Sequence, residues 1–246
     1  MSTIEEALKK RDAQKSQPAS GESSLIIGDE ARVDRRIIAY HQPDTPLTER
    51  FKQFNVALRS FTQGVNSMLA FTSAGKGEGK SVVASNFAVA LAHDCESPVC
   101  IVDADLRNPS LHDLLGMRNT RGLTEVLKRK LSLEDVTLHT PIENLSLIPA
   151  GRVPPIPSGL LSSSRTEQVI GELRSKYKCV IFDTGPVLEV ADTTHLVSLL
   201  DAVVIVIEAG HTSPKKAEEA VKRLGRAECS FILNKSEQEK KVKAYA

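Results

Sequence analysis

A glycine-rich loop lies between an apolar strand and an apolar helix. It occupies residues 72–81, with the sequence Thr-Ser-Ala-Gly-Lys-Gly-Glu-Gly-Lys-Ser. Residues 68–71 predict a short buried strand, and residues 82–93 predict a helix. A loop in this position exposes consecutive backbone N–H groups around one concave point, and the helix N-terminus adds its dipole. Because this arrangement attracts phosphate, the sequence predicts a site for a nucleoside triphosphate.

The residues expected to bind the phosphates belong to the loop itself. Lys80 can reach the outer phosphates, and the Ser81 hydroxyl can hold Mg²⁺. Ala74 departs from the usual P-loop pattern, which has glycine six positions before the lysine. A glycine-rich turn that binds nothing is the alternative, and the flanking strand and helix argue against it. The expected nucleotide-binding residues in the loop are Gly75, Lys76, Gly77, Glu78, Gly79, Lys80 and Ser81.

Composition limits the class of protein. The 246 residues include 41% hydrophobic ones, which suits one large α/β domain with a sizeable core. The net charge is +1, so bulk charge does not indicate a nucleic-acid partner. We see neither a signal peptide nor a membrane span, and the four cysteines lack metal-ligand spacing. We therefore expect a cytoplasmic protein with free thiols at Cys95, Cys100, Cys179 and Cys229.

Strands and helices alternate from residue 68 onward. The expected strands are Met68–Phe71, Val99–Val102, Leu145–Ile148, Cys179–Phe182, Ala202–Ile207 and Phe231–Leu233. The expected helices between them are Val82–His93, Thr166–Lys176, Thr193–Leu199 and Pro214–Leu224. Several strands are continuous apolar runs, as in strands that are covered on both faces. The pattern predicts an α/β fold with a mostly parallel central sheet, helices on both faces and a ligand at the carboxyl ends of the strands.

The chain divides into three expected parts. Residues 1–42 are expected to be a flexible segment with a short helix at Met1–Lys10. Residues 43–234 are expected to form the nucleotide-binding domain, which opens with a helix from Pro46 that Thr48 caps. Residues 235–246 are expected to be a charged, mobile tail.

Aspartates follow two further expected strands. Asp103 and Asp105 follow residues 99–102, and Asp183 follows residues 179–182. A P-loop fold needs such a carboxylate to hold the shell of Mg²⁺, directly or through water. A single aspartate at a strand end is more often a turn or cap residue. Because three strand ends converge on one edge of the sheet, we favour a joint site for ATP and Mg²⁺.

These motifs together resemble those of one protein family. The loop, Ile101-Val102-Asp103-Ala104-Asp105-Leu106-Arg107 and Val180-Ile181-Phe182-Asp183-Thr184 look like the Walker A, A′ and B motifs of bacterial tyrosine kinases, which act in capsular and exopolysaccharide synthesis. The resemblance runs from about Pro43 to Asn234 and implies a P-loop NTPase of the SIMIBI-like type. The start, Met1-Ser2-Thr3-Ile4-Glu5, resembles the subgroup that accompanies exosortase-linked polysaccharide loci.

The resemblance implies a role for each motif. Lys80 and the loop amides would neutralise the β- and γ-phosphates, and Ser81 and Asp183, with Asp105, would organise Mg²⁺. Asp103 would accept the proton of a tyrosine hydroxyl. Full transfer from tyrosine (pKa ~10) to an ordinary aspartate (~4) costs about 8 kcal/mol, so Asp103 should mainly orient the hydroxyl. Asn234 resembles the family's adenine-contacting position, or it is a plain turn asparagine.

The resemblance also implies partners. A membrane-embedded polysaccharide co-polymerase, which determines chain length, would recruit the protein to the inner face of the plasma membrane and activate it there. The protein would touch the membrane only through this partner and would bind no nucleic acid. The family also forms homo-oligomers through a Glu-x-x-Arg-x-x-Arg motif, for which this chain has Glu49, Lys52 and Asn55. Lysine lacks the bidentate fork of arginine, so ring assembly is in doubt.

Other departures from the family concern the loop and the tyrosines. Lys76 and Gly185 each stand where the family usually has proline. The family's C-terminal tyrosine cluster is missing, because the chain has only Tyr40, Tyr177 and Tyr245. Tyr177 is expected to pack beside a strand, and Tyr245 is either the sole acceptor in the tail or a residue without a role.

Three functions remain open from the sequence. The first is a kinase that phosphorylates tyrosine, its own included, and so regulates polymerisation and chain length of a polysaccharide. The second is an ATP-binding switch without kinase activity that acts on the same export machinery. The third is a partitioning or positioning ATPase, but such enzymes carry a signature lysine five residues before the Walker lysine, where this chain has Gly75.

Overall fold

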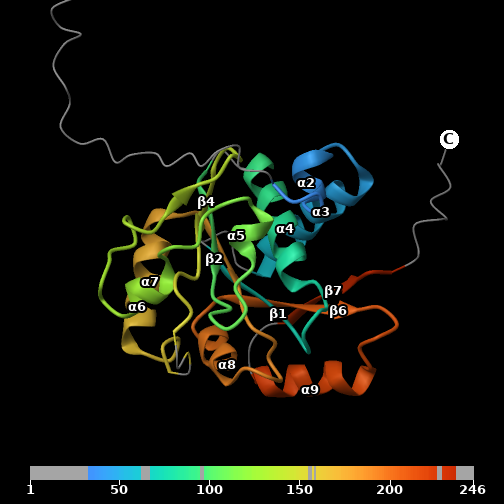
Figure 1. Cartoon of the computed structure of the whole chain (residues 1–246). Coiled ribbons are helices and arrows are strands. Elements are labelled where there is room, and N and C mark those ends of the chain that lie inside the picture. Colours follow the sequence, from blue (N-terminus) through green and yellow to red (C-terminus); the bar gives the residue numbers. More distant parts are fainter. Residues whose placement is uncertain are drawn as a thin grey trace, which may run out of the picture. The chain divides into compact units, whose positions relative to one another are not determined.

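The protein is built around one seven-stranded sheet. The computed structural model describes residues 33–61, 67–94, 97–154, 157, 159–225 and 229–236. The order of the strands is β3-β4-β2-β5-β1-β6-β7, and every neighbouring pair is parallel except β3 and β4 (Figure 1). The strands are β1 (Ser67–Ser73), β2 (Val99–Asp103), β3 (Leu138–His139), β4 (Leu145–Ile148), β5 (Cys179–Asp183), β6 (Ala202–Glu208) and β7 (Cys229–Asn234).

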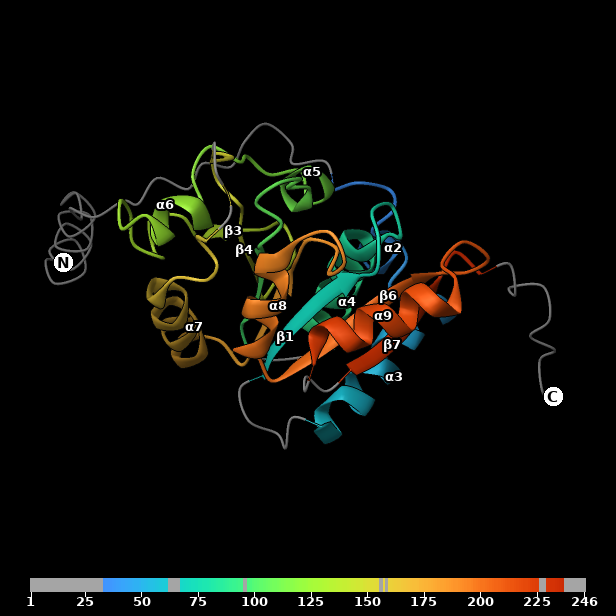
Figure 2. The ribbon, with the colours of Figure 1, turned by 90° about the horizontal axis from the view of Figure 1, so that it is seen from below.

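Helices cover both faces of the sheet, as the sequence predicts. They are α2 (Ile38–His41), α3 (Pro46–Phe61), α4 (Lys80–Asp94), α5 (Leu111–Leu114), α6 (Leu123–Leu127), α7 (Ser164–Lys176), α8 (Ala191–Ser198) and α9 (Pro214–Leu224). Side chains alternate along each strand, so Phe71 of β1 packs with α4 on one face while Met68 packs with α7 on the other. Figures 1 and 2 show β6 and β7 between α3 and α9.

The register of the sheet brings the polar strand ends together. Asp183, the last residue of β5, is the pairing partner of Asp103 in β2 and of Phe71 in β1. The glycine-rich loop leaves β1 two residues later, after Ser73. Because these three central strands are parallel, their carboxyl ends place the loop and both aspartates at one edge of the sheet.

The predicted elements are present with small shifts in their ends. Each of the six predicted strands is found, and five of them extend by one to three residues. β3, an antiparallel strand of two residues, is not predicted from the sequence. Thr48 was wrong as the cap of α3, because it lies inside the first turn. Its N–H donates at 3.4 Å to the hydroxyl of Thr45, the residue before Pro46, and proline suits the first position of a helix.

The packed unit begins earlier than the expected boundary at residue 43. Val33, Ile37 and Ala39 are buried in the same apolar core as α4 and the sheet. The amide of Asn86 in α4 holds this segment, because its Oδ1 accepts the N–H of Ala39 and its Nδ2 donates to the carbonyl of Arg36, both at 2.9 Å. The predictions for residues 1–32 and 237–246, the helix at Met1–Lys10 and the acceptor Tyr245 among them, lie outside the described residues.

The cysteines and Tyr177 can be compared with their predictions. Cys100 and Cys179 are buried and form no disulfide within the described residues, and burial raises the pKa of Cys100. Cys229 also forms no disulfide within the described residues, and Cys95 lies outside them. Tyr177 is partly buried at the end of α7, two residues before β5, where burial raises the pKa of its phenol. The packing of Tyr177 beside a strand is therefore confirmed.

Candidate active site

The glycine-rich loop presents a row of unused backbone donors. Among the residues that the structure describes, the N–H groups of residues 77–81 donate to no protein acceptor. Gly77 and Gly79 have φ values of +83° and +88°, a backbone conformation that residues other than glycine rarely adopt. A Cβ at Gly79 would also lie 2.3 Å from Nδ2 of Asn234. The loop therefore forms a concave nest of N–H groups at the N-terminus of α4, which suits an anion.

Side chains from other elements hold the outer surface of this loop. The carbonyls of Gly75, Gly77 and Glu78 accept hydrogen bonds from Ser73 Oγ at 2.7 Å, Lys235 Nζ at 2.9 Å and Asn234 Nδ2 at 2.9 Å, respectively. Because the carbonyls are engaged on this side, the N–H groups are free to point the other way. Asn234, which the resemblance predicts to contact adenine, supports the loop in this structure through its hydrogen bond to Glu78.

Glu78 is turned away from the nest. Its carboxylate accepts the N–H of Gly75 at 3.2 Å and the hydroxyl of Thr212, which lies in the connection between β6 and α9. Glu78 is buried, so its negative charge has little access to water. In this structure its backbone N–H, rather than its carboxylate, is available to an anion. The side chain fixes the shape of the loop.

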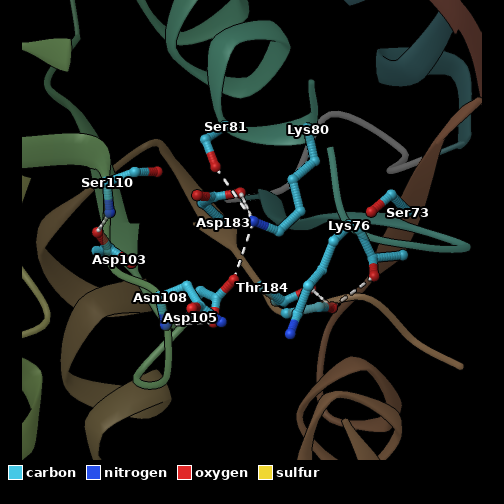
Figure 3. Close-up of polar contacts among 12 residues, drawn as sticks. Ser73, Lys76, Lys80, Ser81, Asp103, Asp105, Asn108, Ser110, Asp183 and Thr184 are labelled. Carbon is cyan, nitrogen blue, oxygen red and sulfur yellow. Dashed lines mark hydrogen bonds and ion pairs between the residues drawn. The ribbon is translucent and has the colours of Figure 1, made fainter. Parts of the chain in front are cut away.

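Lys80 is surrounded by carboxylates from the two neighbouring strand ends. Its Nζ lies 3.0 Å from Asp105 Oδ2, 3.9 Å from Asp183 Oδ1 and 3.2 Å from the hydroxyl of Ser81 (Figure 3). Burial favours the neutral amine, but the negative charges of Asp183 and Asp105 outweigh it and raise the pKa of Lys80. Lys80 is therefore a charged, nearly buried ammonium group beside the open N–H nest.

Asp183 has buried oxygens without hydrogen bonds. Its side chain is fully buried, and neither carboxylate oxygen makes a hydrogen bond of ordinary geometry within the described residues. Burial raises the pKa of Asp183 to about 6, against the opposing effects of Lys80 and the Ser81 hydroxyl. Buried polar atoms without partners are rare and need an explanation, such as a ligand that completes them.

The oxygen atoms at this point suit Mg²⁺. A hard cation prefers carboxylate and hydroxyl oxygens, and it commonly takes its other ligands from phosphates and water. Asp183 and Ser81 offer such oxygens side by side. Asp105 is less free, because its two oxygens already accept from Lys80 and from the N–H of Asn108 at 3.1 Å. No cluster of three or more His, Cys, Asp or Glu arranged for a metal occurs in the described part of the chain.

Asp103 has one occupied oxygen and one unused oxygen. Its Oδ2 accepts the N–H groups of Ser110 at 2.9 Å and Leu111 at 3.0 Å, at the start of α5, whereas Oδ1 has no partner among the described residues. Burial and the neighbouring charge of Asp183 raise the pKa of Asp103 well above its usual range. The structure thus brings Lys80, Ser81, Asp103, Asp105 and Asp183 together at one edge of the sheet (Figure 3).

Gly185 has a steric reason to be glycine. A Cβ at this position would lie 2.9 Å from Cγ2 of Val190. Its carbonyl accepts hydrogen bonds from the hydroxyls of Thr72 and Thr193, at 2.9 and 3.0 Å. These contacts fix the segment after Asp183 against β1 and α8.

Three further residues contact the loop without being predicted from the sequence. Thr212 and Lys235 contact it from the β6 side of the sheet, and Glu189 contacts it from the segment after β5. None of them belongs to a recognisable motif. Only the long-range pairing of strands shows that they are neighbours of residues 75–78.

The fold and the site together define the class of the protein. A parallel sheet, an N–H nest at a helix N-terminus and a lysine within it are the parts of a P-loop nucleotide-binding domain. A model of the AAA domain family matches residues 67–235. The tyrosine-protein kinase YwqD of Bacillus subtilis is 35% identical over 204 residues, which cover 82% of this chain and 85% of the relative. The chain belongs to the family of bacterial tyrosine-protein kinases.

Solved structures agree with this family. The kinase domain of Escherichia coli tyrosine kinase ETK has a TM-score of 0.74 and 26% identity, covering 91% of this chain and 87% of that one. The chimerical protein CapA2B2 has a TM-score of 0.73 and 28% identity, and the match covers 78% of this chain and 85% of that one. A septum site-determining protein MinD from Pyrococcus horikoshii, complexed with Mg-ADP, has a TM-score of 0.55 and 25% identity. The match covers 70% of this chain and 72% of that one.

The chain matches only part of some relatives. In the tyrosine-protein kinase ptk of Acinetobacter johnsonii, the match is 31% identical over 202 residues and covers 80% of this chain but 27% of the relative. A ParA family ATPase from Chlorobium tepidum, with a TM-score of 0.60 and 24% identity over 71% of this chain and 76% of that one, shares the fold alone. Of the helices in the described residues, none has the length and apolar character to cross a membrane.

Proposed function

We propose that this protein transfers the γ-phosphoryl group of ATP to tyrosine hydroxyls, and that it thereby regulates polymerisation and chain length of an extracellular polysaccharide. The observation that carries the proposal is the position of Lys80, 3.0 Å from Asp105 and 3.9 Å from Asp183, beside a row of open N–H groups. Membership of the tyrosine-kinase family supports tyrosine as the acceptor, and the resemblance of the motifs supports the link to polysaccharides.

The residues of the site divide the work of phosphoryl transfer. The N–H groups of residues 77–81 and Lys80 bind the phosphates and neutralise charge on them. Ser81 and Asp183, with Asp105 near them, hold Mg²⁺, which when bound neutralises charge that develops on the phosphoryl oxygens. Because the transition state of phosphoryl transfer is loose, positioning and charge stabilisation by these residues supply most of the rate.

Asp103 orients the acceptor. Its unused Oδ1 is the atom that accepts the hydroxyl of an incoming tyrosine, while Oδ2 stays bonded to the start of α5. Because the pKa of Asp103 is raised, it lies closer to the pKa of a tyrosine hydroxyl. Proton transfer from tyrosine to Asp103 therefore costs less than the ~8 kcal/mol expected for tyrosine and an ordinary aspartate. Asp103 is fully buried, and the acceptor therefore reaches it only after the residues that cover it move aside.

The proposal includes a partner and a location. We expect the protein at the cytoplasmic face of the plasma membrane, docked on a membrane-embedded polysaccharide co-polymerase. The longer relatives support this, because the part that matches this chain is about a quarter of their length. Assembly through the usual helix motif has little support here, since Lys52 forms an ion pair at 3.3 Å with Asp94 of its own chain.

The test is a phosphorylation assay with the purified full chain, Mg²⁺ and labelled ATP, with and without the cytoplasmic segments of the co-polymerase. Phosphotyrosine on either protein is the expected result, and Asp103→Asn should reduce it without loss of ATP binding. The absence of phosphotyrosine under both conditions, with ATP binding intact, would reject kinase activity.

The small number of tyrosines in the chain favours a second function. Besides Tyr40 and Tyr177, the chain has only Tyr245, so the tail from residue 235 offers one acceptor. The second function is an ATP-dependent switch that signals to the same machinery by its shape. A Tyr245→Phe chain that leaves polymer length unchanged, together with no phosphotyrosine on any protein from the native cell by mass spectrometry, would favour this switch.

A further inference from the structure

Lys76 and Glu189 form a contact that the mechanism above does not use. Oε1 of Glu189 accepts the backbone N–H of Lys76 at 3.2 Å, and Oε2 of the same carboxylate lies 3.5 Å from Lys76 Nζ. One carboxylate therefore bonds both the backbone and the side chain of one loop residue. It is the arrangement that a phosphate oxygen would make with a P-loop residue that carries a positive charge.

Both partners are positioned at the phosphate end of the site. Glu189 lies six residues after Asp183, and this segment continues along β1, because the N–H groups of Thr184 and Val187 donate at 2.9 Å to the carbonyls of Phe71 and Ser73. In Figure 3 the side chains of Lys76 and Lys80 extend from the same side of the loop. The open N–H groups begin directly after Lys76, at residue 77.

The contact is easily displaced. The side chains of Lys76 and Glu189 are 66% and 41% exposed, and exposed ion pairs of this kind add little to stability. A γ-phosphate carries more charge than a carboxylate and would repel Glu189 while attracting Lys76. ADP, which has no γ-phosphate, would leave the pair in place.

We propose that Lys76 is a second phosphate-binding cation that recognises the γ-phosphate of ATP, and that Glu189 holds it in the absence of a triphosphate. The proposal rests on the nucleotide site described above and adds to it a means of distinguishing ATP from ADP. Proline, the residue that the resemblance leads us to expect at this position, has neither an N–H nor a charge. A proline there would lack both bonds to Glu189, so this recognition belongs to the present chain.

Calorimetry on the full chain with Mg²⁺ tests the proposal, with ADP and the non-hydrolysable β,γ-imido analogue of ATP as probes. Lys76→Met should weaken binding of the triphosphate about tenfold and change binding of ADP by less than twofold. Glu189→Gln should strengthen binding of the triphosphate severalfold with ADP unchanged, because it removes the competing charge. Lys215→Met, at an exposed position of α9, is the matched control for the loss of one positive charge.

Two results would overturn the proposal. One is an unchanged ratio of triphosphate to ADP affinity in Lys76→Met, whether both affinities fall together or neither moves. The other is weaker triphosphate binding in Glu189→Gln, which would mean that the pair supports the loop rather than competing with phosphate. In either case the wild-type chain would still bind ATP, so the proposed nucleotide site would stand. That site itself would fall only if the unmodified chain bound no nucleotide.

Discussion

The two sides of the glycine-rich loop are built from different interactions. On the inner side, Lys80 meets the carboxylates of Asp105 and Asp183, all of them buried or nearly so. On the outer side, the partly buried amide of Asn234 and the exposed ammonium group of Lys235 donate hydrogen bonds to backbone carbonyls. The inner side keeps charges ready for a ligand at a cost in stability, whereas the outer side keeps the backbone in shape. Substitutions on the two sides should therefore differ in kind as well as in size.

The largest effect is expected on the inner side, from Lys80→Met. This change removes the positive charge between the phosphates and two buried carboxylates, so those carboxylates lose their cation as well. Nucleotide affinity and tyrosine phosphorylation should each fall by about 100-fold or more. Calorimetry and a phosphotyrosine assay measure the two effects, with circular dichroism as the control for the fold. Unchanged ATP binding would contradict the assignment of the site.

Asp183→Asn should separate activity from stability. The folded-state pKa of about 6 lies above the ordinary 3.8, so the folded protein retains a proton that the unfolded chain releases. The stability that this proton provides is complete below pH ~4 and is lost as the pH rises through 6. Above pH 7 the ionised carboxylate therefore costs on the order of 3 kcal/mol when neither metal nor nucleotide is bound.

The expected result for Asp183→Asn is a loss of phosphorylation together with a more stable fold. Urea unfolding at pH 8 should give the variant a free energy of unfolding about 1–3 kcal/mol above that of the wild-type chain. The difference should shrink at pH 4.5, where the wild-type carboxyl is protonated. A variant that is less stable than wild type at pH 8 would show that Asp183 is held by contacts other than those seen here.

Asn234→Ala tests the outer side with a smaller expected effect. It removes the hydrogen bond from Nδ2 to the carbonyl of Glu78, and a partly buried hydrogen bond of this kind contributes about 1 kcal/mol. Nucleotide affinity should fall by about fivefold, because the loop must be ordered on binding, while the turnover of bound ATP stays within a factor of two. A change in turnover larger than the change in affinity would place Asn234 among the groups that contact the reacting phosphate.

Lys235→Ala should have the smallest effect. The side chain is about half exposed, and its contacts with Gly77 and Glu208 are open to water. Removing it should lower stability and nucleotide affinity by less than about 1 kcal/mol, and the loss should vanish in high salt. An effect equal to that of Asn234→Ala at 0.5 M salt would show that the two sides are less distinct than the contacts indicate.

The sequence predicts the inner side well and the outer side poorly. The loop, Asp103, Asp105 and Asp183 each follow a strand of recognisable composition, and the rule that parallel strands end together places them at one edge of the sheet. The position of Glu78 in the loop predicts a nucleotide-binding residue, but it does not predict that the carboxylate bonds to Thr212, which is 134 residues away. Contacts over such a distance depend on the order of strands, which a single sequence does not specify.

Very short strands and helix caps are also not predicted by the pattern of apolar and polar residues in the sequence. β3 has two residues and no periodicity that a sequence can show, and it is formed because β4 has an unpaired edge beside it. The sequence predicts Thr48 as a cap, but the helix begins at Pro46, where the fixed φ of proline suits the first turn. In both cases the local sequence allows more than one structure. Pairing with β4 selects the strand, and the fixed φ of Pro46 selects the start of the helix.

The position of Asn234 at the end of β7 has a consequence for the dynamics of the loop. In the described part of the sheet, β7 is an outer strand that pairs with β6 alone. Outer strands open more readily than central ones, so the loop is tied to a part of the sheet with low local stability. Nucleotide that orders the loop should therefore slow the hydrogen exchange of amides in β7, and a break in the β6–β7 ladder should speed the release of nucleotide.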